Sequence, residues 1–334
     1  MTWMIGIDEA GYGPNLGPLV VAATAWWVDD EHTPFTTSAP QNAPPVDLYS
    51  RLAKIISEKP TPDHLAIADS KLLYKPRGGL QWLEQAVLTG LATVNGNAPA
   101  RWQQFWEVTL ADPAEHRHDL PWYANYNCPL PIDAVAAERD DIQNKFQSAC
   151  SAANTRLVDL RARAVFPGEF NDLTAHHGTK GAALSHISIA LLKDVLNNLP
   201  TAACPLPTTF VTCDKHGGRN RYAELLEQHF TDERIETLLE SRPASRYRWG
   251  AAEKRVEVCF RTKGEAELPA ALASMTAKYH RELAMRAFNA YWTEKIPDLR
   301  PTAGYPVDAK RFKAQIADMQ KKLGIDDHYL WRNR

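Results

Sequence analysis

Four carboxylates of this chain follow predicted strands, where they could bind a cation together. Asp8 and Glu9 end the first apolar run, and Asp214 and Glu265 each follow a later β-branched run. Carboxylates at neighbouring strand ends would face one another and repel unless hard cations lie between them. Magnesium takes oxygen ligands and keeps waters for substrate phosphates, and two ions about 4 Å apart can clamp a phosphodiester. A single acid at a strand end is more often a solvated turn residue, and Asp214 alone would be interpreted that way.

The segment that follows Asp8 is typical of a binding loop. Residues 6–18 have the sequence Gly-Ile-Asp-Glu-Ala-Gly-Tyr-Gly-Pro-Asn-Leu-Gly-Pro, which sets two acids against three later glycines and two prolines. Glycines let backbone amides approach a ligand closely, a property that phosphate-binding loops use. A plain hairpin loop does not need this density of glycine and proline.

The elements that must position these acids are short strands and amphipathic helices. Residues 3–7 and Leu19–Val28 predict buried strands, and the tight loop between them predicts a hairpin. The later predicted elements are a strand at 157–166, a helix from Thr179 to Pro200, strands at 209–213 and Val256–Arg261, and a helix after Pro269 with an apolar stripe of Leu272, Met275, Tyr279 and Leu283. This order indicates an α/β protein with a mixed central sheet flanked by helices.

Two stretches are less regular. Residues 33–46 are rich in Pro, Thr, Ser, Asn and Gln, which predicts a surface loop. Six aromatic side chains lie between Trp102 and Tyr126; they could stack on bases, but the core of a small subdomain is the preferred interpretation. Asp133 is predicted to cap a helix with apolar positions at Val135, Ile142, Phe146 and Ala149.

The composition limits the class of protein. With 44% hydrophobic and 23% charged residues among 334, the chain is globular. The net charge of −2 requires any nucleic-acid surface to be local; the basic run from Arg242 to Lys263 is one candidate, and a solvated strand face is its alternative. The five cysteines lack zinc-pair spacing, the start has no basic signal-peptide region, and the longest apolar run, Leu19–Val28, is about half a membrane span. We expect a soluble, cytoplasmic monomer without membrane contact.

Four motifs, in order along the chain, resemble those of ribonuclease HII and its HIII relatives. Residues 8–14 are similar to the family's Asp-Glu-Ala-Gly-Arg-Gly-Pro, residues 69–72 to its Asp-Ser-Lys-Lys-Leu, and residues 304–306 to a late Gly-Tyr motif. Residues 263–271, continued by Ser274, Ala277-Lys278 and Arg281-Glu282, are similar to its Lys-Gly-Asp-Ala-Lys segment and the helix that follows. The resemblance spans nearly the whole chain. It implies a ribonuclease H-like fold with a catalytic domain at 1–292, insertions near 30–47, 98–150 and 219–255, and a C-terminal helical extension at 293–334 that carries the Gly-Tyr motif.

The resemblance also implies a site and an activity. The family's metal-binding acids correspond to Asp8, Glu9, Asp214 and Glu265, with Asp8 between two Mg²⁺ or Mn²⁺ ions. Its substrate-binding residues correspond to Gly11, Tyr12 and Gly13 along the nucleic-acid strand, Ser70 and Lys71 at backbone phosphates, and Tyr305 on the ribose, where it would sense the 2′-hydroxyl. The implied function is hydrolysis of the RNA strand of RNA–DNA hybrids, or of DNA containing ribonucleotides, with 5′-phosphate and 3′-hydroxyl products.

Three positions depart from the family pattern. Tyr12 stands where Arg is usual, Glu265 where Asp is common, and Glu267 where Lys is frequent. Tyrosine offers stacking and one hydroxyl in place of a cationic fork. Two alternatives therefore stay open: a nuclease of this fold with a different nucleic-acid substrate, and a binding relative without turnover. The presence of all four acids argues against the second, because clustered carboxylates without a metal are costly.

Overall fold

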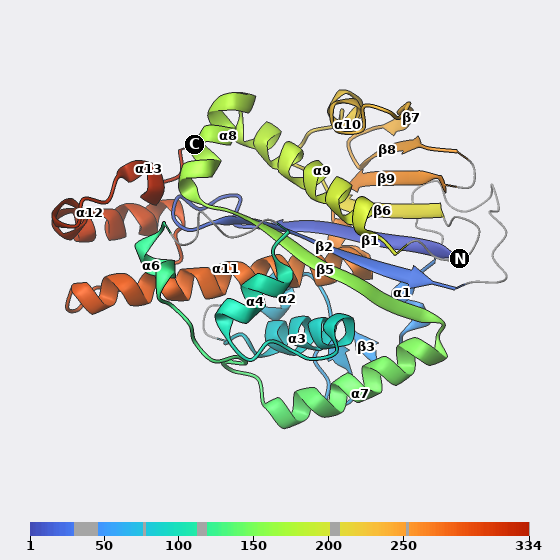
Figure 1. Cartoon of the computed structure of the whole chain (residues 1–334), viewed down its shortest axis with the longest axis horizontal. Coiled ribbons are helices and arrows are strands. Elements are labelled where there is room, and N and C mark those ends of the chain that lie inside the picture. Colours follow the sequence, from blue (N-terminus) through green and yellow to red (C-terminus); the bar gives the residue numbers. More distant parts are fainter. Residues whose placement is uncertain (30–45, 76–77, 112–118, 201–207, 252–253, 334) are drawn as a thin grey trace.

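The computed structural model describes residues 1–29, 46–75, 78–111, 119–200, 208–251 and 254–333. Its centre is a seven-stranded mixed sheet with the strand order β5-β2-β1-β6-β9-β8-β7 (Figure 1). The strands are β1 (Thr2–Ala10), β2 (Leu19–Val28), β5 (Thr155–Val165), β6 (Thr208–Asp214), β7 (Glu236–Glu240), β8 (Ala244–Trp249) and β9 (Val256–Arg261). A separate parallel pair is formed by β3 (Ile56–Ser57) and β4 (Leu65–Ala66).

The pairing of the strands defines the fold. β1, β2 and β5 are antiparallel neighbours, whereas β6 runs parallel to β1 and β9 runs parallel to β6. Three antiparallel strands followed by two parallel ones make the ribonuclease H-like arrangement, so the predicted fold class is confirmed. β8 and β7 extend the sheet beyond β9 as an antiparallel pair. Both strands lie within residues 219–255, where the family resemblance predicts an insertion.

Helices cover both faces of the sheet (Figure 1). One layer contains α8 (Pro167–His177), α9 (Lys180–Asn198) and α10 (Ala223–His229), and the other contains α3 (Gln81–Asn95), α4 (Trp102–Thr109), α7 (Ala136–Ala152) and α11 (Leu268–Lys295). The two-residue period of a strand divides β1 between these layers: Ile5 and Ile7 join the apolar cluster under α9, and Met4 joins the cluster under α11. Shorter or peripheral helices are α1 (Leu48–Arg51), α2 (Ser70–Leu73), α6 (Pro121–Ala124), α12 (Pro306–Lys322) and α13 (Asp327–Leu330).

The aromatic residues between Trp102 and Tyr126 pack against helix α11. Its 28 residues extend about 42 Å at 1.5 Å per residue, and its apolar side chains need cover along this length. The ring of Phe105 lies 5.0 Å from that of Tyr279, and the ring of Trp122 lies 5.2 Å from that of Phe288. Five of the six aromatic residues belong to the main core, and Tyr126 packs partly buried against it. The predicted subdomain core is therefore wrong, and the five buried rings do not stack on bases.

Asp133 does not cap α7 as predicted. Its carboxylate accepts the backbone N–H of Leu80 at 2.7 Å, and α7 follows Val135 with no side-chain cap. The fully buried carboxylate of Glu84 accepts the N–H groups of Ile132, Asp133 and Ala134 at 2.6, 2.7 and 2.9 Å. This arrangement turns the segment before α7 toward α3. Val135, predicted as an apolar helix position, is largely exposed.

The sequence also predicts a surface loop at 33–46 and no membrane-spanning segment, and its five cysteines lack zinc-pair spacing. The loop predicted at 33–46 lies outside the described residues up to residue 45, as does Cys204. Cys128, Cys150, Cys213 and Cys259 are free thiols. None of the helices in the described ranges combines the length and apolar character needed to cross a membrane.

Candidate active site

Asp8 lies near the carboxyl end of β1, on the side of the sheet that α11 covers. Its side chain is only 7% exposed and accepts a hydrogen bond from the hydroxyl of Ser274 on α11. Burial raises the pKa of Asp8 well above its usual value, and the negative charges of Glu9 and Asp214 raise it further. A carboxylate held in this setting is a strong ligand for a cation that relieves the repulsion.

The other three acids surround Asp8 within electrostatic reach. Burial and the charge of Asp214 raise the pKa of Glu9 to about 7, and Lys71 offsets part of that effect. Burial raises the pKa of Asp214, although the amide of Gly264 donates to its Oδ1 at 3.1 Å. Burial and the charge of Asp214 also raise the pKa of Glu265. The four predicted acids thus influence one another, as the parallel order of β1, β6 and β9 requires.

Lys71 is the cation that acts on this cluster. It lies in α2, after Asp69, whose carboxylate caps that helix through the N–H of Lys71 at 3.0 Å. Burial acts to lower the pKa of Lys71, but the charges of Asp69, Asp8, Glu265 and Asp214 together raise it. Because the single positive charge of Lys71 faces these four carboxylates, the ends of β1 and β6 keep a net negative charge.

Glycine at two positions allows the elements to meet. A Cβ on Gly6 would lie 2.0 Å from the backbone nitrogen of Ala270, so only glycine lets α11 approach β1 closely enough to bring Ser274 to Asp8. A Cβ on Gly264 would lie 3.0 Å from the nitrogen of Asp214, which allows the turn after β9 to pack against the end of β6. The same turn carries Glu265 in a short 3₁₀ helix at Gly264–Ala266.

The chemistry of these donors suits a hard divalent ion, because all four are carboxylate oxygens. In the parts of the chain that the structure describes, no three His, Cys, Asp or Glu side chains are arranged around a common point that could hold a metal. Two of the acids are turned toward protein donors instead, Asp8 toward Ser274 and Asp214 toward Gly264. The donor types and the net charge fit a cation, and closure around one requires these side chains to turn.

The loop between β1 and β2 carries three of the predicted substrate-binding residues. Gly11 has φ +89°, a conformation that favours glycine, and Gly13 faces open space, since nothing lies within 4 Å of a Cβ built there. Tyr12 contacts a residue that sequence reasoning missed: the Nζ atom of Lys180 lies 4.5 Å from the centroid of its ring. Lysine in the first turn of α9 opposes the helix dipole, but this is a weak signal, and the sequence alone does not show that Lys180 reaches Tyr12.

The other predicted substrate-binding residues differ in exposure. Tyr305 precedes α12 with 52% of its surface exposed, and the neighbouring carbonyl of Gly304 accepts the N–H of Asn15 at 2.8 Å, which ties Tyr305 to the glycine loop. Ser70 is buried, and its hydroxyl lies 3.1 Å from that of Ser274. The side chain of Ser70 therefore points into the protein, and Lys71 is the residue of this pair that faces the acids.

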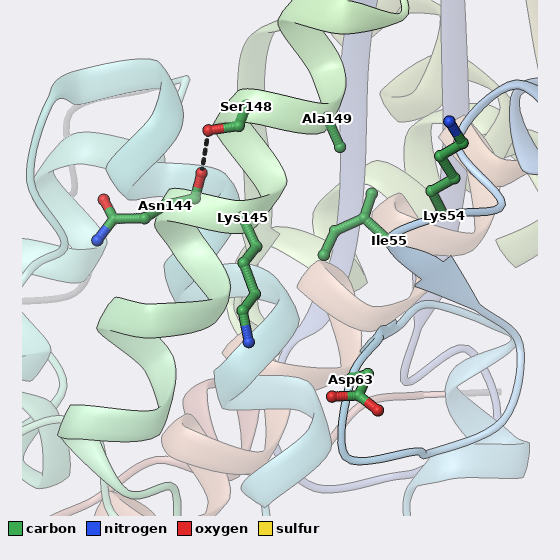
Figure 2. A pocket seen from close by; sticks show the side chains of 7 residues that line it. All are labelled: Lys54, Ile55, Asp63, Asn144, Lys145, Ser148 and Ala149. Atoms are coloured by element: carbon green, nitrogen blue, oxygen red, sulfur yellow. Dashed lines mark hydrogen bonds between the residues drawn. The ribbon is translucent and has the colours of Figure 1, made fainter.

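A surface hollow of about 450 Å³ lies apart from this site, against α7 (Figure 2). It is lined by Lys54, Ile55, Asp63, Asn144, Lys145, Ser148 and Ala149. Lys145 pairs with Asp141 at 2.6 Å, and the hydroxyl of Ser148 donates to the carbonyl of Asn144 at 2.8 Å. These polar groups are engaged within α7, and the hollow contains none of the predicted site residues.

Comparisons with known proteins find similarity among solved structures. No family model and no curated protein matches the chain. It is similar to a chain in the structure of the PCNA:RNase HII complex from Archaeoglobus fulgidus, with 16% identity and a TM-score of 0.41 over 99% of this chain and 94% of that one. It is also similar to ribonuclease H2 from Pyrococcus horikoshii OT3, with 14% identity and a TM-score of 0.43 over 98% and 92%. Bst-RNase HIII in complex with Mn²⁺ is similar at 13% identity and a TM-score of 0.42, over 99% of this chain and 66% of that one.

Proposed function

We propose that this chain is a divergent type 2 ribonuclease H, a metal-dependent endonuclease that hydrolyses the RNA strand of RNA–DNA hybrids. The observation that carries the proposal is the mutual influence of Asp8, Glu9, Asp214 and Glu265 beside an open glycine loop. Buried carboxylates that repel one another are unfavourable for folding, and such groups concentrate at functional sites.

In this proposal, Asp8, Glu9, Asp214 and Glu265 would hold Mg²⁺ or Mn²⁺, with two ions when substrate is bound. Such ions activate water and stabilise the charge that develops on the departing oxygen. The oxygen of water bonds to phosphorus, the bond to the 3′ oxygen breaks, and that oxygen gains a proton, which leaves 5′-phosphate and 3′-hydroxyl ends. Ser274 holds Asp8 through a hydrogen bond in the metal-free protein, and Asp8 would exchange that bond for the metal, while Lys71 balances part of the negative charge.

The substrate would lie across the loop at Gly11–Gly13. The open space above Gly13 permits a sugar-phosphate strand to approach the backbone, and Lys180 places a cation on the ring of Tyr12. That cation supplies positive charge at the position where the family usually has Arg. Tyr305 is exposed and can pack on a ribose, where its hydroxyl would detect the 2′-hydroxyl that distinguishes RNA from DNA.

Cleavage of three labelled duplexes tests the proposal. They are a full RNA–DNA hybrid, a DNA duplex with one ribonucleotide, and an all-DNA duplex, each incubated with Mg²⁺, with Mn²⁺ and with chelator. We expect metal-dependent cutting of the hybrid, no cutting of all-DNA, and loss of cutting in Asp8→Asn. Asp141→Asn is the matched control, because Asp141 is exposed on α7 and pairs only with Lys145 in the described contacts.

The same panel separates the alternatives. Cutting of the all-DNA duplex would indicate a nuclease of this fold with a different substrate. Binding of the hybrid without cutting, by folded protein in the presence of either metal, would indicate a relative that lacks turnover. Either result would overturn the proposed activity.

A further inference from the structure

The segment that follows α13 lies beneath the glycine loop and holds it from inside the protein. The guanidinium group of Arg332 donates through Nε to the carbonyl of Pro14 at 3.1 Å, and through Nη2 to the carbonyls of Gly11 and Pro14. The backbone of Arg332 also pairs with Asn15, whose carbonyl accepts its N–H at 2.8 Å and whose side-chain amide donates to its carbonyl at 2.9 Å. More than 300 residues of sequence separate the two partners.

Helix α8 fixes this segment in place. The side-chain amide of Asn171 donates to the carbonyl of Trp331 at 2.9 Å, and its Oδ1 accepts the N–H of Asn333 at 2.8 Å. The guanidinium of Arg332 lies 4.6 Å from the ring centroid of Phe170. Arg332 is consequently only 1% exposed. Contacts with the glycine loop on one side and with α8 on the other fix its position.

A second buried arginine holds the remainder of the loop. Arg281 of α11 donates to the carbonyls of Pro18 and Leu16 at 3.3 and 3.5 Å. Burial and the charge of Arg281 lower the pKa of Arg332 to about 9, and its Nη1 has no hydrogen-bond partner among the described residues. Two guanidinium groups are thus buried together, and their acceptors are the loop carbonyls and, for Arg281, also the carbonyl of Ala303 at 2.9 Å.

The buried arginines also affect the outer side of the loop, where Gly13 faces open space. Carbonyl groups that accept from the buried arginines are directed inward, away from the open space at Gly13. Two cations behind the loop also add a positive contribution to the potential at its outer face, which opposes the negative contribution of the neighbouring carboxylates and favours an anion at the loop. A flexible glycine loop would lose this orientation without its anchors.

We propose that Arg332 is a positioning residue, which holds the Gly11–Asn15 backbone in the conformation that receives a phosphate group of the nucleic acid. The inference rests on the proposed function for the identity of the ligand. The anchoring itself does not depend on that function. Arg332 touches neither substrate nor metal in this proposal, and it acts through the loop.

Hydrogen exchange tests the anchoring without any activity measurement. In Arg332→Ala, the amides of Asn15 and Leu16 should exchange at least about tenfold faster, while those of α11 stay unchanged. Arg332→Lys, which keeps one donor, should give an intermediate effect. Arg51→Ala is the matched control, since Arg51 donates to the carbonyls of Ala153 and Asp29 at 2.8 and 3.0 Å, at the other end of β2. Unchanged exchange of the loop in a folded Arg332→Ala protein would overturn the proposal.

Kinetics on the RNA–DNA hybrid then test the role in binding. Arg332→Ala should raise KM by about tenfold or more, because the loop no longer holds the conformation that binds phosphate, with a smaller change in kcat. Millimolar guanidinium should restore part of the lost affinity in Arg332→Ala and have no such effect on the Arg51→Ala control. A fall in kcat with unchanged KM, or no rescue, would contradict the positioning role. If the wild type cuts no duplex, the proposed function fails, while the exchange result still decides the anchoring.

Discussion

Replacing Glu9 by glutamine should stabilise the metal-free protein at alkaline pH. Burial and Asp214 raise the pKa of Glu9 to about 7 from an ordinary value of 4.5. A raised carboxyl pKa means that the folded chain binds more protons than the unfolded chain between these two values. Stability is therefore lost as pH rises through the window from 4.5 to 7, and the loss is complete above it. Glutamine has no charge to desolvate, so the variant should escape this loss.

The size of the effect follows from the pKa difference. At pH 8, ionised Glu9 lowers the free energy of unfolding by roughly 3 kcal/mol if the whole difference applies. Glu9 is partly exposed, so water relieves some of the penalty, and about 1–3 kcal/mol is expected. An unfolding entropy of about 2.1 cal/mol/K per residue converts this range into a rise in Tm of roughly 1.5–4 °C for a chain of 334 residues.

The assay is thermal unfolding of wild type and Glu9→Gln between pH 5 and pH 8, with chelator present. Groups other than Glu9 titrate in both proteins, so the difference in Tm between them isolates this side chain. The difference should grow with pH. Glu84→Gln is the matched control with the opposite sign, because the buried carboxylate of Glu84 accepts three backbone N–H groups and the hydroxyl of Tyr279 at 3.0 Å.

Two results would refute this reasoning. The first is a Glu9→Gln protein that is less stable than wild type at pH 8 in chelator. The second is a difference in Tm that does not change between pH 5 and pH 8. Either would mean that the four carboxylates do not repel one another as their placement indicates.

Four further substitutions give sharp expectations. Glu84→Gln should lower the free energy of unfolding by about 2 kcal/mol or more, since glutamine keeps one acceptor oxygen and two of the four donors lose theirs; a denaturant midpoint like that of wild type would contradict this. Gly6→Ala should prevent folding or cost more than about 4 kcal/mol, because the new Cβ would lie 2.0 Å from the backbone of α11; a soluble variant with unchanged Tm would disprove the close approach. Lys180→Ala should reduce the salt dependence of hybrid binding by about one phosphate contact, whereas Lys193→Ala, which removes a lysine bonded to the carbonyl of His229, should not. Tyr305→Ala should slow cleavage of the hybrid at least about tenfold, with Tm changed by less than about 2 °C, because half of the side chain is exposed.

The central strands were predictable because a strand that is buried on both faces has an apolar sequence. Leu19–Val28 is buried along its whole length in β2, so an unbroken apolar run marks both of its ends. β7 and β8 were not predicted. β7 is an edge strand whose side chains are exposed or half-buried, and Glu236 of β7 pairs with Arg248 of β8. Such a strand is stabilised by its neighbour, and its own residues carry no apolar pattern.

The candidate site was predictable mainly where its residues stand in local sequence motifs. Asp8, Glu9 and Glu265 stand in short motifs whose residues are adjacent in sequence, so these three acids could be named as candidates without the fold. Asp214 lies in none of these motifs and was named from its place after a β-branched run and from the family resemblance. Ser274, Lys180 and Arg332 act on them or on the loop from distant parts of the chain. Tertiary packing alone brings these residues together, and a lone arginine after α13 has no feature in the sequence that separates it from a solvated one. Glu84 was missed because a glutamate within a helix usually faces solvent.

The most direct test of the proposed site is a calorimetric titration of Mn²⁺ into the metal-free protein at pH 8. The wild type should bind Mn²⁺ in a saturable manner, Asp8→Asn should lose affinity by at least about tenfold, the loss of about 1.4 kcal/mol or more, and Asp141→Asn should bind like the wild type. Absence of binding by folded wild type, or equal binding by Asp8→Asn, would contradict the proposal that these carboxylates form the metal site of a nuclease.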